Sequence, residues 1–555
     1  MGSAVIVQGL TFTHRGGERP ALVDVNLTID EGTFTAVLGH AGCGKSSLCL
    51  ALNGLIPRFV PGQLEGNVVA NGIPIRDSAV ADLAQVIGLV FQDFESQLVS
   101  TSVELEVAFG PENYAIPREE IRQRLDRYLA LVGMEEFRSR APASLSGGEK
   151  QRLAIAAVLA LEPDILVMDE PTTDLDATGQ DDVLRVAHEV TKAGRTLVLV
   201  EHDTEAVTTA DQVVLMKEGG IAASGVARVV LSDPRLLVSC GVRPPQVAEL
   251  FHRLGLSERP LTVEEGLAHL QGSKRSVRRV EPTTPSPVHG PVIIQARDTS
   301  YTYREGDNPV LQHLNLTVRA GEFLAIVGQN GSGKTTLGKL LSGLLRPSAG
   351  DVLLGGVGVA SLGRGTLARL VGYVFQNPDS QIFSPTVYEE VGFGPANFGV
   401  PKEEIKERVA ESLRAVGLDG YERCDPFALT KGERQRVAVA SVLAARPKAL
   451  ILDEPTTGLD YRQQLSMMEM LTQLNRSGHT IVIITHSMWA ATDYAARTIV
   501  LQNGAITLDG DTRYVFTRED VLASARLRPP PIVQLSNRLG AGSLTTGELA
   551  AALRS

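Results

Sequence analysis

The 555-residue sequence is poor in basic residues and in cysteine. Lys and Arg number 53 against 64 Asp and Glu, which gives a formal net charge of −11. Nucleic acids and anionic membrane surfaces usually bind proteins through an excess of positive charge, so this balance argues against a general nucleic-acid binder or a strongly basic membrane-surface protein. The four cysteines show no CxxC spacing, which supports neither a disulfide framework nor a zinc site.

Long apolar runs are also absent. The longest, such as residues 154–161 and 449–452, are far shorter than the roughly 20 residues that cross a bilayer. The first six residues, MGSAVI, lack the regions of a signal peptide and the Ser or Thr at position 6 of a myristoylation signal. We therefore expect a cytosolic location and no spanning segment. The composition, with 43% hydrophobic and 21% charged residues, is that of a globular chain of about two to four domains.

The chain contains a tandem repeat. Residues 37–46 read VLGHAGCGKS and residues 326–335 read IVGQNGSGKT, an offset of 289. Further along, the offset is 284, as between Gln92 and Gln376. Self-similarity over this length indicates two copies of one domain.

The change in offset comes from five extra residues in the first copy, between Gly54 and Gly66. We expect a longer surface loop there, with a specific contact made by that loop as the alternative. Each copy ends with a similar tail, in which an RPP triplet (243–245 and 528–530) is followed by a Leu-Thr pair. The duplication therefore covers nearly the whole chain.

These boundaries divide the chain into a first domain with its tail (1–270), a linker (271–291) and a second domain with its tail (292–555). The linker carries four basic residues followed by a run rich in Pro, Thr and Ser. Such a composition predicts a solvated, partly extended segment. Contact of its basic cluster with anionic lipid is the alternative.

The fold class follows from two kinds of pattern. Each copy begins with segments of period two, at 4–14 and 21–30 in the first and at 292–303 and 310–319 in the second. These segments predict an antiparallel edge sheet. Later short apolar runs end in acidic or His residues and alternate with helical patterns, which predicts a parallel α/β core.

The motif GxxxxGK[ST] in each copy is typical of a phosphate-binding loop. It follows predicted strands at 34–38 and 323–327 and precedes predicted helices at 47–52 and 336–341. Glycines let backbone N–H groups approach phosphates, the Lys reaches the β and γ oxygens, and the Ser or Thr hydroxyl holds Mg²⁺. The predicted nucleotide-binding residues are Gly39, Gly42, Gly44, Lys45, Ser46, Ser47, Gly328, Gly331, Gly333, Lys334, Thr335 and Thr336, with Ser46 and Thr335 as metal ligands.

A carboxylate pair ends one apolar strand in each copy. Asp169-Glu170 follows ILVM, and Asp453-Glu454 follows LIL. Ligands of α/β proteins bind at the carboxyl ends of such strands. We expect the Asp to orient Mg²⁺ through water and the Glu to polarise the attacking water. A solvated acidic end of a core strand is the alternative for either run alone.

Residues 145–152, LSGGEKQR, precede an apolar-rich helix, where a hydroxyl and helix-terminal N–H groups form an anion site. This octet completes a set with the phosphate loops, the carboxylate strands, Gln92 and Gln376, the Leu-Asp pairs at 175–176 and 459–460, and His202 and His486. The set resembles the ATP-binding cassette (ABC) ATPases, over roughly residues 4–230 and 292–515. The fold it implies is two tandem P-loop domains, each with a parallel α/β core, an antiparallel edge sheet and a helical signature subdomain.

The resemblance also implies roles for residues. Two cassettes of this family close head to tail, so each ATP would lie between one copy's phosphate loop and the other's signature, here by intramolecular pairing. The signature residues are Ser146, Gly147, Gly148, Thr430 and Gly432. The catalytic residues would be Glu170, Glu454, His202, His486, Gln92 and Gln376, and the metal ligands would include Asp169, Asp453 and both Gln residues. Tyr303 and His14 would stack on adenine, with Phe12 as another candidate and an ordinary edge-sheet role as the alternative.

A segment after each predicted Q-loop glutamine narrows the family. Residues 376–383 read QNPDSQIF and are followed by VGFGPAN, and residues 92–98 read QDFESQL and are followed by VAFGPEN. These segments look like the Q-loop region of energy-coupling factor (ECF) importers, although Asp93-Phe94 replaces Asn-Pro in the first copy. In that family the segment meets coupling helices of an integral-membrane T component, which works with a substrate-binding S component.

The resemblance implies an ATP-binding subunit that is peripheral on the cytoplasmic face of the membrane. It would hydrolyse MgATP to drive uptake of a vitamin or a transition-metal ion. A tandem ATPase of a sugar-type ABC importer is one alternative, and a soluble ABC-type translation factor is another. The short linker and the acidic charge argue against the translation factor, and no nucleic-acid partner is expected.

Departures inside the repeat predict two unequal ATP sites. The second copy has Lys431 where the first has Gly147, and the first has Ala41 and Cys43 where the second has Asn330 and Ser332. Under head-to-tail pairing, all of these departures fall in the composite site of the first phosphate loop. Equal turnover at both sites is the alternative.

Overall fold

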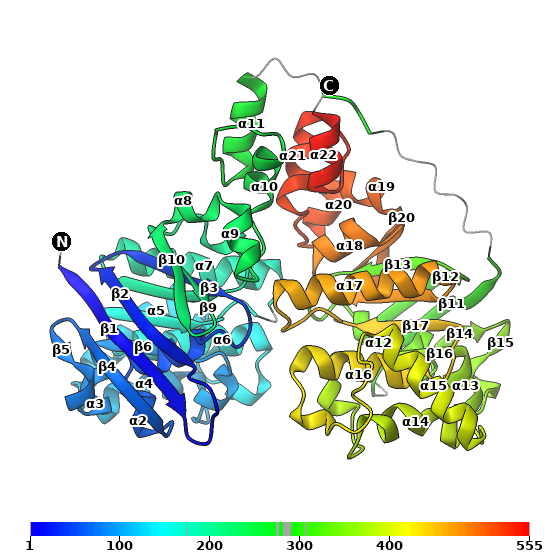
Figure 1. Ribbon diagram of the computed structural model, residues 1–555, viewed down its shortest axis with the longest axis horizontal. Helices are drawn as coiled ribbons and strands as arrows, with labels where there is room; N and C mark the ends of the chain where they lie inside the picture. Colours follow the sequence, from blue (N-terminus) through cyan, green and yellow to red (C-terminus); the bar gives the residue numbers. More distant parts are fainter. Residues whose placement is uncertain are drawn as a thin grey trace. The chain divides into compact units, whose positions relative to one another are not determined.

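The computed structural model describes residues 2–173, 175–272, 277–280, 290–304, 306 and 308–553. Two compact units make up the chain, Met1–Glu265 and Gly266–Ser555 (Figure 1). Most of the predicted linker, 273–276 and 281–289, lies outside the described residues. Its described part is tied to the tail of the second unit, because the N–H of Arg278 donates to Ala552 and that of Val280 donates to Ala541.

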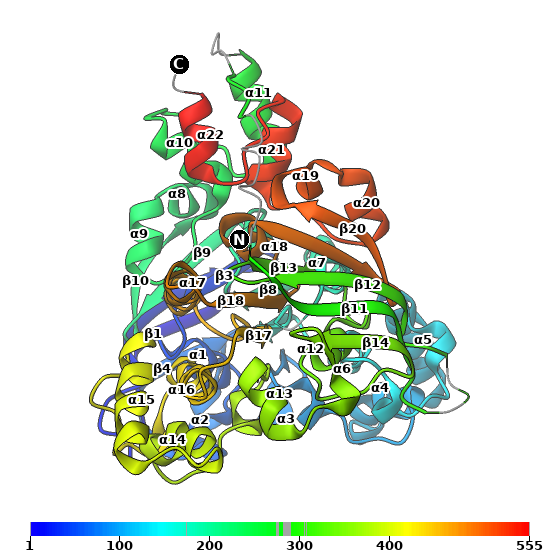
Figure 2. The same cartoon turned by 90° about the vertical axis from the view of Figure 1, so that its right-hand side faces the viewer.

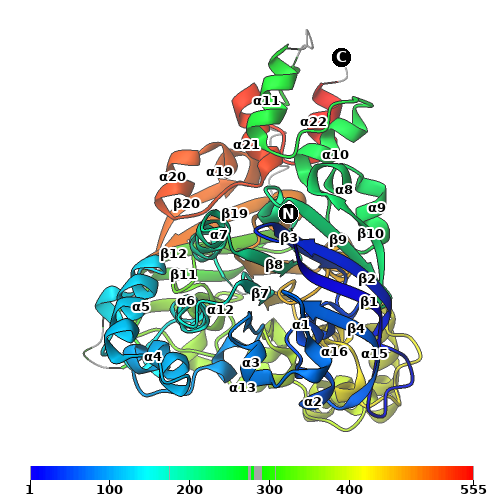
Figure 3. The same cartoon turned by 90° about the vertical axis from the view of Figure 1, so that its left-hand side faces the viewer.

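The strands of the first unit form two sheets. One has four strands in the order β2-β1-β4-β5, and the other has six in the order β10-β9-β3-β8-β7-β6. Their bounds are β1 (Ser3–His14), β2 (Leu22–Asp30), β3 (Phe34–Gly39), β4 (Gly62–Ala70), β5 (Ile73–Pro74), β6 (Ile87–Val90), β7 (Ile165–Asp169), β8 (Thr196–Glu201), β9 (Gln212–Lys217) and β10 (Gly220–Val226). The first sheet is antiparallel, and the second is parallel apart from β10 at its edge. Figure 3 shows β1, β2 and β4 side by side.

Helices of the first unit connect and cover these sheets. They are α1 (Lys45–Leu52), α2 (Leu55–Arg58), α3 (Val80–Leu83), α4 (Val103–Asn113), α5 (Arg118–Leu131), α6 (Gly147–Leu159), α7 (Ala177–Lys192), α8 (Ala227–Leu231), α9 (Pro234–Ser239) and α10 (Gln246–Arg253), with α11 (Val263–Gly272) crossing the boundary between the units. Helix α6 begins with a capping box, in which the Ser146 hydroxyl and the Glu149 carboxylate satisfy each other's backbone N–H groups.

The second unit repeats this plan. Its sheets have the orders β12-β11-β14-β15 and β16-β17-β18-β13-β19-β20. The strands are β11 (Val292–Tyr301), β12 (Leu311–Arg319), β13 (Phe323–Val327), β14 (Ala349–Leu354), β15 (Val357–Gly358), β16 (Val371–Val374), β17 (Ala449–Asp453), β18 (Thr480–Thr485), β19 (Arg497–Gln502) and β20 (Ala505–Asp511). The helices are α12 (Lys334–Leu341), α13 (Arg364–Leu370), α14 (Val387–Asn397), α15 (Lys402–Ala415), α16 (Lys431–Leu443), α17 (Tyr461–Arg476), α18 (Met488–Tyr494), α19 (Thr512–Thr517), α20 (Glu519–Ser524), α21 (Pro531–Leu539) and α22 (Thr546–Ala552). Figure 2 shows β11, β12 and β14 side by side.

The parallel strands are buried on both faces, which explains their continuous apolar runs. In β3, Ala36 and Leu38 belong to the core shared with helices α4 to α6, whereas Val37 belongs to the core shared with α1 and the antiparallel sheet. The predicted antiparallel edge sheet and parallel core are therefore confirmed in both copies. Among the described residues, no helix is long and apolar enough to cross a membrane.

The extra residues of the first copy do not form the longer loop that we predicted. They form α2 and the beginning of β4, whose Gly62 pairs with His14 at the end of β1. In the second copy, β14 begins only at Ala349, opposite Ser300. Arg58, at the end of α2, donates hydrogen bonds to the carbonyl groups of three other residues, Gly54, Ile75 and Arg76.

Candidate functional site

The two phosphate loops have the backbone that their glycines permit. Gly42 and Gly44 have φ values of 75° and 106°, and Gly331 and Gly333 have values of 78° and 100°. This left-handed region is open to glycine and costly for most other residues. At Gly44 a Cβ atom would also lie only 2.4 Å from a backbone oxygen, that of Ala21. The predicted turn between strand and helix is present in each copy.

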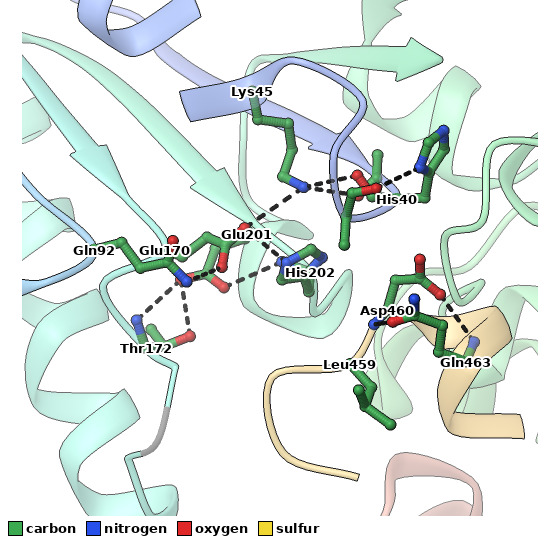
Figure 4. Close-up of polar contacts among 12 residues, drawn as sticks. His40, Lys45, Gln92, Glu170, Thr172, Glu201, His202, Leu459, Asp460 and Gln463 are labelled. Carbon is green, nitrogen blue, oxygen red and sulfur yellow. Dashed lines mark hydrogen bonds and ion pairs between the residues drawn. The ribbon is translucent and has the colours of Figure 1, made fainter. Parts of the chain in front are cut away.

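The lysine of each loop is buried and folds back on the loop. Lys45 Nζ donates to the carbonyl oxygens of Gly39 at 3.0 Å and His40 at 3.1 Å (Figure 4). Lys334 makes the same bonds to Gly328 and Gln329, at 2.8 and 3.0 Å. Two carbonyl groups of the same loop therefore fix the position of each lysine ammonium group.

Glu170 is the meeting point of the first copy's polar residues. Its Oε1 lies 2.7 Å from Nε2 of His202 and 3.5 Å from Nζ of Lys45, and its Oε2 accepts from Nε2 of Gln92 at 2.9 Å (Figure 4). Burial alone would raise the pKa of Glu170, but the hydrogen bond and charge of His202 and the charge of Lys45 outweigh it and lower that pKa. The side chain is thereby kept ionised, as a proton acceptor must be.

Glu454 is held differently in the second copy. The ring atom Nδ1 of His486 lies 2.9 Å from its Oε1, and the backbone N–H of His486 donates to the same oxygen at 3.1 Å. Thr485 and Thr457 donate through their hydroxyls to Oε2, at 3.2 and 3.4 Å. Burial raises the pKa of Glu454, and His486 and Lys334 lower it by more, so the net shift is downward. Gln376 is exposed.

Both carboxylates sit on strained backbone. Glu170 and Glu454 have φ values of 50° and 48°, in the left-handed region that residues with a Cβ avoid. Strain of this kind persists where the surrounding structure fixes it, and it gathers at functional sites. Each residue immediately follows its strand, β7 or β17, as the sequence predicts.

The residues predicted to hold Mg²⁺ fit a divalent ion. Ser46 interacts with Asp169 and Thr335 interacts with Asp453, so each copy brings together a hydroxyl and a carboxylate. One oxygen of each Asp, Oδ1, is buried and has no hydrogen-bond partner in the described part of the chain. A buried carboxylate oxygen needs a compensating partner, and oxygen ligands are those that Mg²⁺ prefers. Burial raises the pKa of both Asp residues.

The predicted adenine-stacking residues lie beside the phosphate loops. His14 Nε2 is 3.4 Å from the Ser47 hydroxyl, and the Tyr303 hydroxyl is 3.0 Å from that of Thr336. Tyr303 is 56% exposed, which leaves its ring accessible to a base. The two pairs occupy equivalent positions in the repeat.

The signature residues begin helices α6 and α16. Ser146 and Thr430 are their N-caps, each in a capping box with the Glu three residues later. The side chain of Lys431 packs against Gly458, because a Cβ atom added at Gly458 would lie only 2.1 Å from Nζ of the lysine. The lysine side chain thus lies over the loop that precedes α17. Pairing of each signature with the other copy's phosphate loop stays a prediction.

Sequence reasoning missed two buried groups. Glu201, only 2% exposed, accepts from the hydroxyl and N–H of Thr172 at 2.8 and 3.3 Å and from the N–H of His202 at 3.3 Å (Figure 4). Burial raises its pKa to about 8. Tyr373 donates to Oδ2 of Asp453 at 2.8 Å, and burial together with that carboxylate raises the pKa of the phenol. The only available signal was a mismatch within the repeat, with Thr485 opposite Glu201 and Leu89 opposite Tyr373.

These two sites define a P-loop nucleotide-binding protein with two nucleotide sites in one chain. The sequence matches the family described as ABC transporter over residues 22–173 and 311–457. A putative ABC transporter ATP-binding protein of Caldanaerobacter subterraneus subsp. tengcongensis is 47% identical over 558 residues, covering 98% of this chain and 98% of that protein. Another, of Methanosarcina acetivorans, is 39% identical and covers 95% of this chain and 89% of that protein.

The chain therefore belongs to the ABC transporter family, as a tandem ATP-binding protein. ATP-binding proteins of this family are ATPases, and so is this chain. The solved structure of cbiO1 from Clostridium perfringens, part of the ABC transporter complex cbiONQ, is 35% identical; it covers 44% of this chain and 98% of that chain, with a TM-score of 0.39.

Proposed function

We propose that this chain is the ATP-binding subunit of an ECF-type importer. It hydrolyses MgATP at two composite sites and drives uptake of a vitamin or a transition-metal ion through separate membrane components. It is peripheral, on the cytoplasmic face, where it docks onto a T component that works with an S component. The observation that carries the proposal is a pair of exposed apolar side chains after each Q-loop glutamine.

The residues of each site divide the chemistry. Lys45 and Lys334 place a positive charge for the β and γ phosphates, and Ser46, Thr335, Asp169 and Asp453 would hold the magnesium ion, Asp through water. When bound, Mg²⁺ supplies charge neutralisation of the phosphates. Glu170 and Glu454, kept ionised by their His partners, accept hydrogen bonds from the attacking water and take its proton. His202 and His486 also reach the γ-phosphate.

The docking surface of the second copy is built around Gln381. Its side chain accepts from the N–H of Phe375 at 3.2 Å and donates to the Ala438 carbonyl at 2.9 Å, which fixes the segment on α16. Phe383 is 59% exposed and Phe393 is 48% exposed, and their rings form an edge-to-face pair with centroids 4.7 Å apart. An exposed aromatic pair on a fixed backbone suits an apolar protein partner such as a coupling helix.

In both copies a glutamate side chain holds the backbone of this segment, but the first copy lacks the aromatic pair. Glu390 accepts from the backbone N–H of Phe383, and in the first copy Glu106 accepts in the same way from Val99. Val99 is 65% exposed and Phe109 is 50% exposed, at the positions of Phe383 and Phe393. Two similar apolar surfaces, one smaller, fit two coupling helices that differ in sequence.

The test is purification of the chain from native membranes with identification of the small hydrophobic proteins that accompany it. Replacing Phe383 and Phe393 by Ala should reduce the recovered membrane proteins at least about tenfold, because buried aromatic anchors dominate interface energies. Val357→Ala, which removes another exposed apolar side chain of the second unit, is the matched control. Undiminished recovery with the double variant would contradict the docking surface. Recovery of sugar-type permeases instead of T and S components would favour that alternative importer class.

A further inference from the structure

Tyr373 makes a contact in the second copy that has no counterpart in the first. It is the third residue of β16, next to β17, and its hydroxyl donates to Oδ2 of Asp453 at 2.8 Å. Tyr373 is 8% exposed and Asp453 is 3% exposed, so water cannot readily replace the bond. The third residue of β6 in the first copy is Leu89, which has no hydroxyl to offer Asp169.

Space for the phenol ring comes from a glycine. Gly338 lies inside α12, and a Cβ there would be 3.2 Å from Cε2 of Tyr373 and 2.4 Å from Cδ1 of Ile484. Glycine in a helix interior costs about 1 kcal/mol relative to Ala, so it needs a packing reason. The first copy has Cys49 at the equivalent position of α1, fully buried. Tyrosine and glycine therefore occur together in the second copy and are both absent from the first.

The contact restricts the Asp453 carboxylate. With Oδ2 accepting from Tyr373, the carboxylate cannot rotate without breaking a buried hydrogen bond, and Oδ1 is the oxygen left without a partner among the described residues. Asp169 has the same unpartnered Oδ1 but no phenol beside it. A hydrogen bond to a charged acceptor is stronger than a neutral one and holds its geometry better.

We propose that Tyr373 is a positioning residue of the second copy's magnesium–nucleotide site, which fixes the Asp453 carboxylate so that its second oxygen is available to water-bound Mg²⁺. The first copy lacks this device. The inference rests on the assignment of Asp453 to Mg²⁺ in the proposed function. The hydrogen bond from Tyr373 gives the second site a higher affinity for Mg²⁺ than the first site at equal nucleotide concentration.

The test measures binding and not turnover. In the full-length chain with Lys45→Ala, which weakens the first site, a fluorescent non-hydrolysable ATP analogue reports the second site. Nucleotide affinity is measured in EDTA and as Mg²⁺ is titrated. Tyr373→Phe keeps the ring and removes only the hydroxyl, so we expect the Mg²⁺ midpoint to rise roughly tenfold. The affinity in EDTA should stay within about twofold of the parent.

The reciprocal transfer tests the same idea in the first copy. In a Lys334→Ala background, Cys49→Gly together with Leu89→Tyr recreates the glycine and the phenol beside Asp169. We expect the Mg²⁺ midpoint of the first site to fall, whereas Cys49→Gly alone should not lower it. Thermal unfolding of each variant shows whether the repacked core still folds.

Three results separate the possibilities. An unchanged Mg²⁺ midpoint in Tyr373→Phe would overturn the positioning role. Equal losses of affinity in EDTA and in Mg²⁺ would also overturn it, because they would show that the hydroxyl only supports packing. If the parent second site showed no Mg²⁺-dependent binding at all, the assignment of Asp453 to Mg²⁺ would fail instead.

Discussion

His202 contacts Glu170 through Nε2 at 2.7 Å. The equivalent pair in the second copy meets through the other ring nitrogen, with Nδ1 of His486 at 2.9 Å from Glu454. The preceding residue accounts for part of the change. The Glu201 side chain accepts a hydrogen bond from the backbone N–H of His202, whereas the backbone N–H of His486 donates to Glu454 itself. The residue next to the histidine thus directs a backbone donor to Glu201 in the first copy and to Glu454 in the second.

The first prediction concerns the phosphate-loop lysines. Lys334 is 7% exposed and held by two loop carbonyls, so its charge is fixed near the glycine-rich turn. Lys334→Ala removes that charge and should lower turnover by about 10²-fold or more, with weaker nucleotide binding. Steady-state phosphate release and nucleotide titration measure both effects. Unchanged ATPase activity would contradict the assignment of this loop.

The second prediction is a pH dependence of stability caused by Glu201. Its pKa is raised to about 8 in the folded protein, so the folded chain binds more protons than the unfolded chain between pH 4.5 and about 8. By linkage, this group's contribution to the free energy of unfolding falls as pH rises through that window. Glu201→Gln mimics the protonated acid at every pH and should remove the loss.

We therefore expect Glu201→Gln to unfold at the same temperature as the parent near pH 5 and at a higher temperature near pH 8. The difference at pH 8 should be on the order of 2–4 kcal/mol in unfolding free energy. Circular dichroism melts of both proteins across this range provide the measurement. A difference that stayed constant with pH, or that grew toward acid, would show that Glu201 is ionised throughout.

Much of the fold follows from local sequence. The strand predicted at 323–327 is β13 without change, and the one predicted at 34–38 is one residue short of β3. These strands are buried on both faces, so their apolar runs are unbroken and easy to recognise. The structure of the stretch between Gly54 and Gly66 is harder to predict from the sequence. Its outcome depends on whether β4 can pair with the end of β1, which is a long-range contact that no local pattern records.

The site shows the same division. The phosphate-loop glycines and lysines are adjacent in sequence, so their motif predicts their geometry. Glu201 and Tyr373 act across neighbouring strands, on Thr172 and on Asp453, and only strand order and register bring these pairs together. Their residue types are ordinary for buried strands, and a comparison of the two copies was the one sequence signal available.

The last prediction is the inequality of the two ATP sites. Under head-to-tail pairing, the site of Lys45, Asp169 and Glu170 receives the signature that contains Lys431, and its own loop carries Ala41 and Cys43. The other site joins Glu454 to the unaltered signature. Loss of a general base typically costs about 10²–10⁴-fold in rate, so replacing each Glu separates the sites.

The most direct measurement is steady-state ATP hydrolysis by Glu454→Gln and Glu170→Gln, assayed side by side in the full-length chain. Both changes keep the size of the side chain and remove the proton acceptor. We predict that Glu454→Gln nearly abolishes hydrolysis, whereas Glu170→Gln retains a larger residual rate. Equal losses in the two variants, or a larger loss in Glu170→Gln, would contradict it.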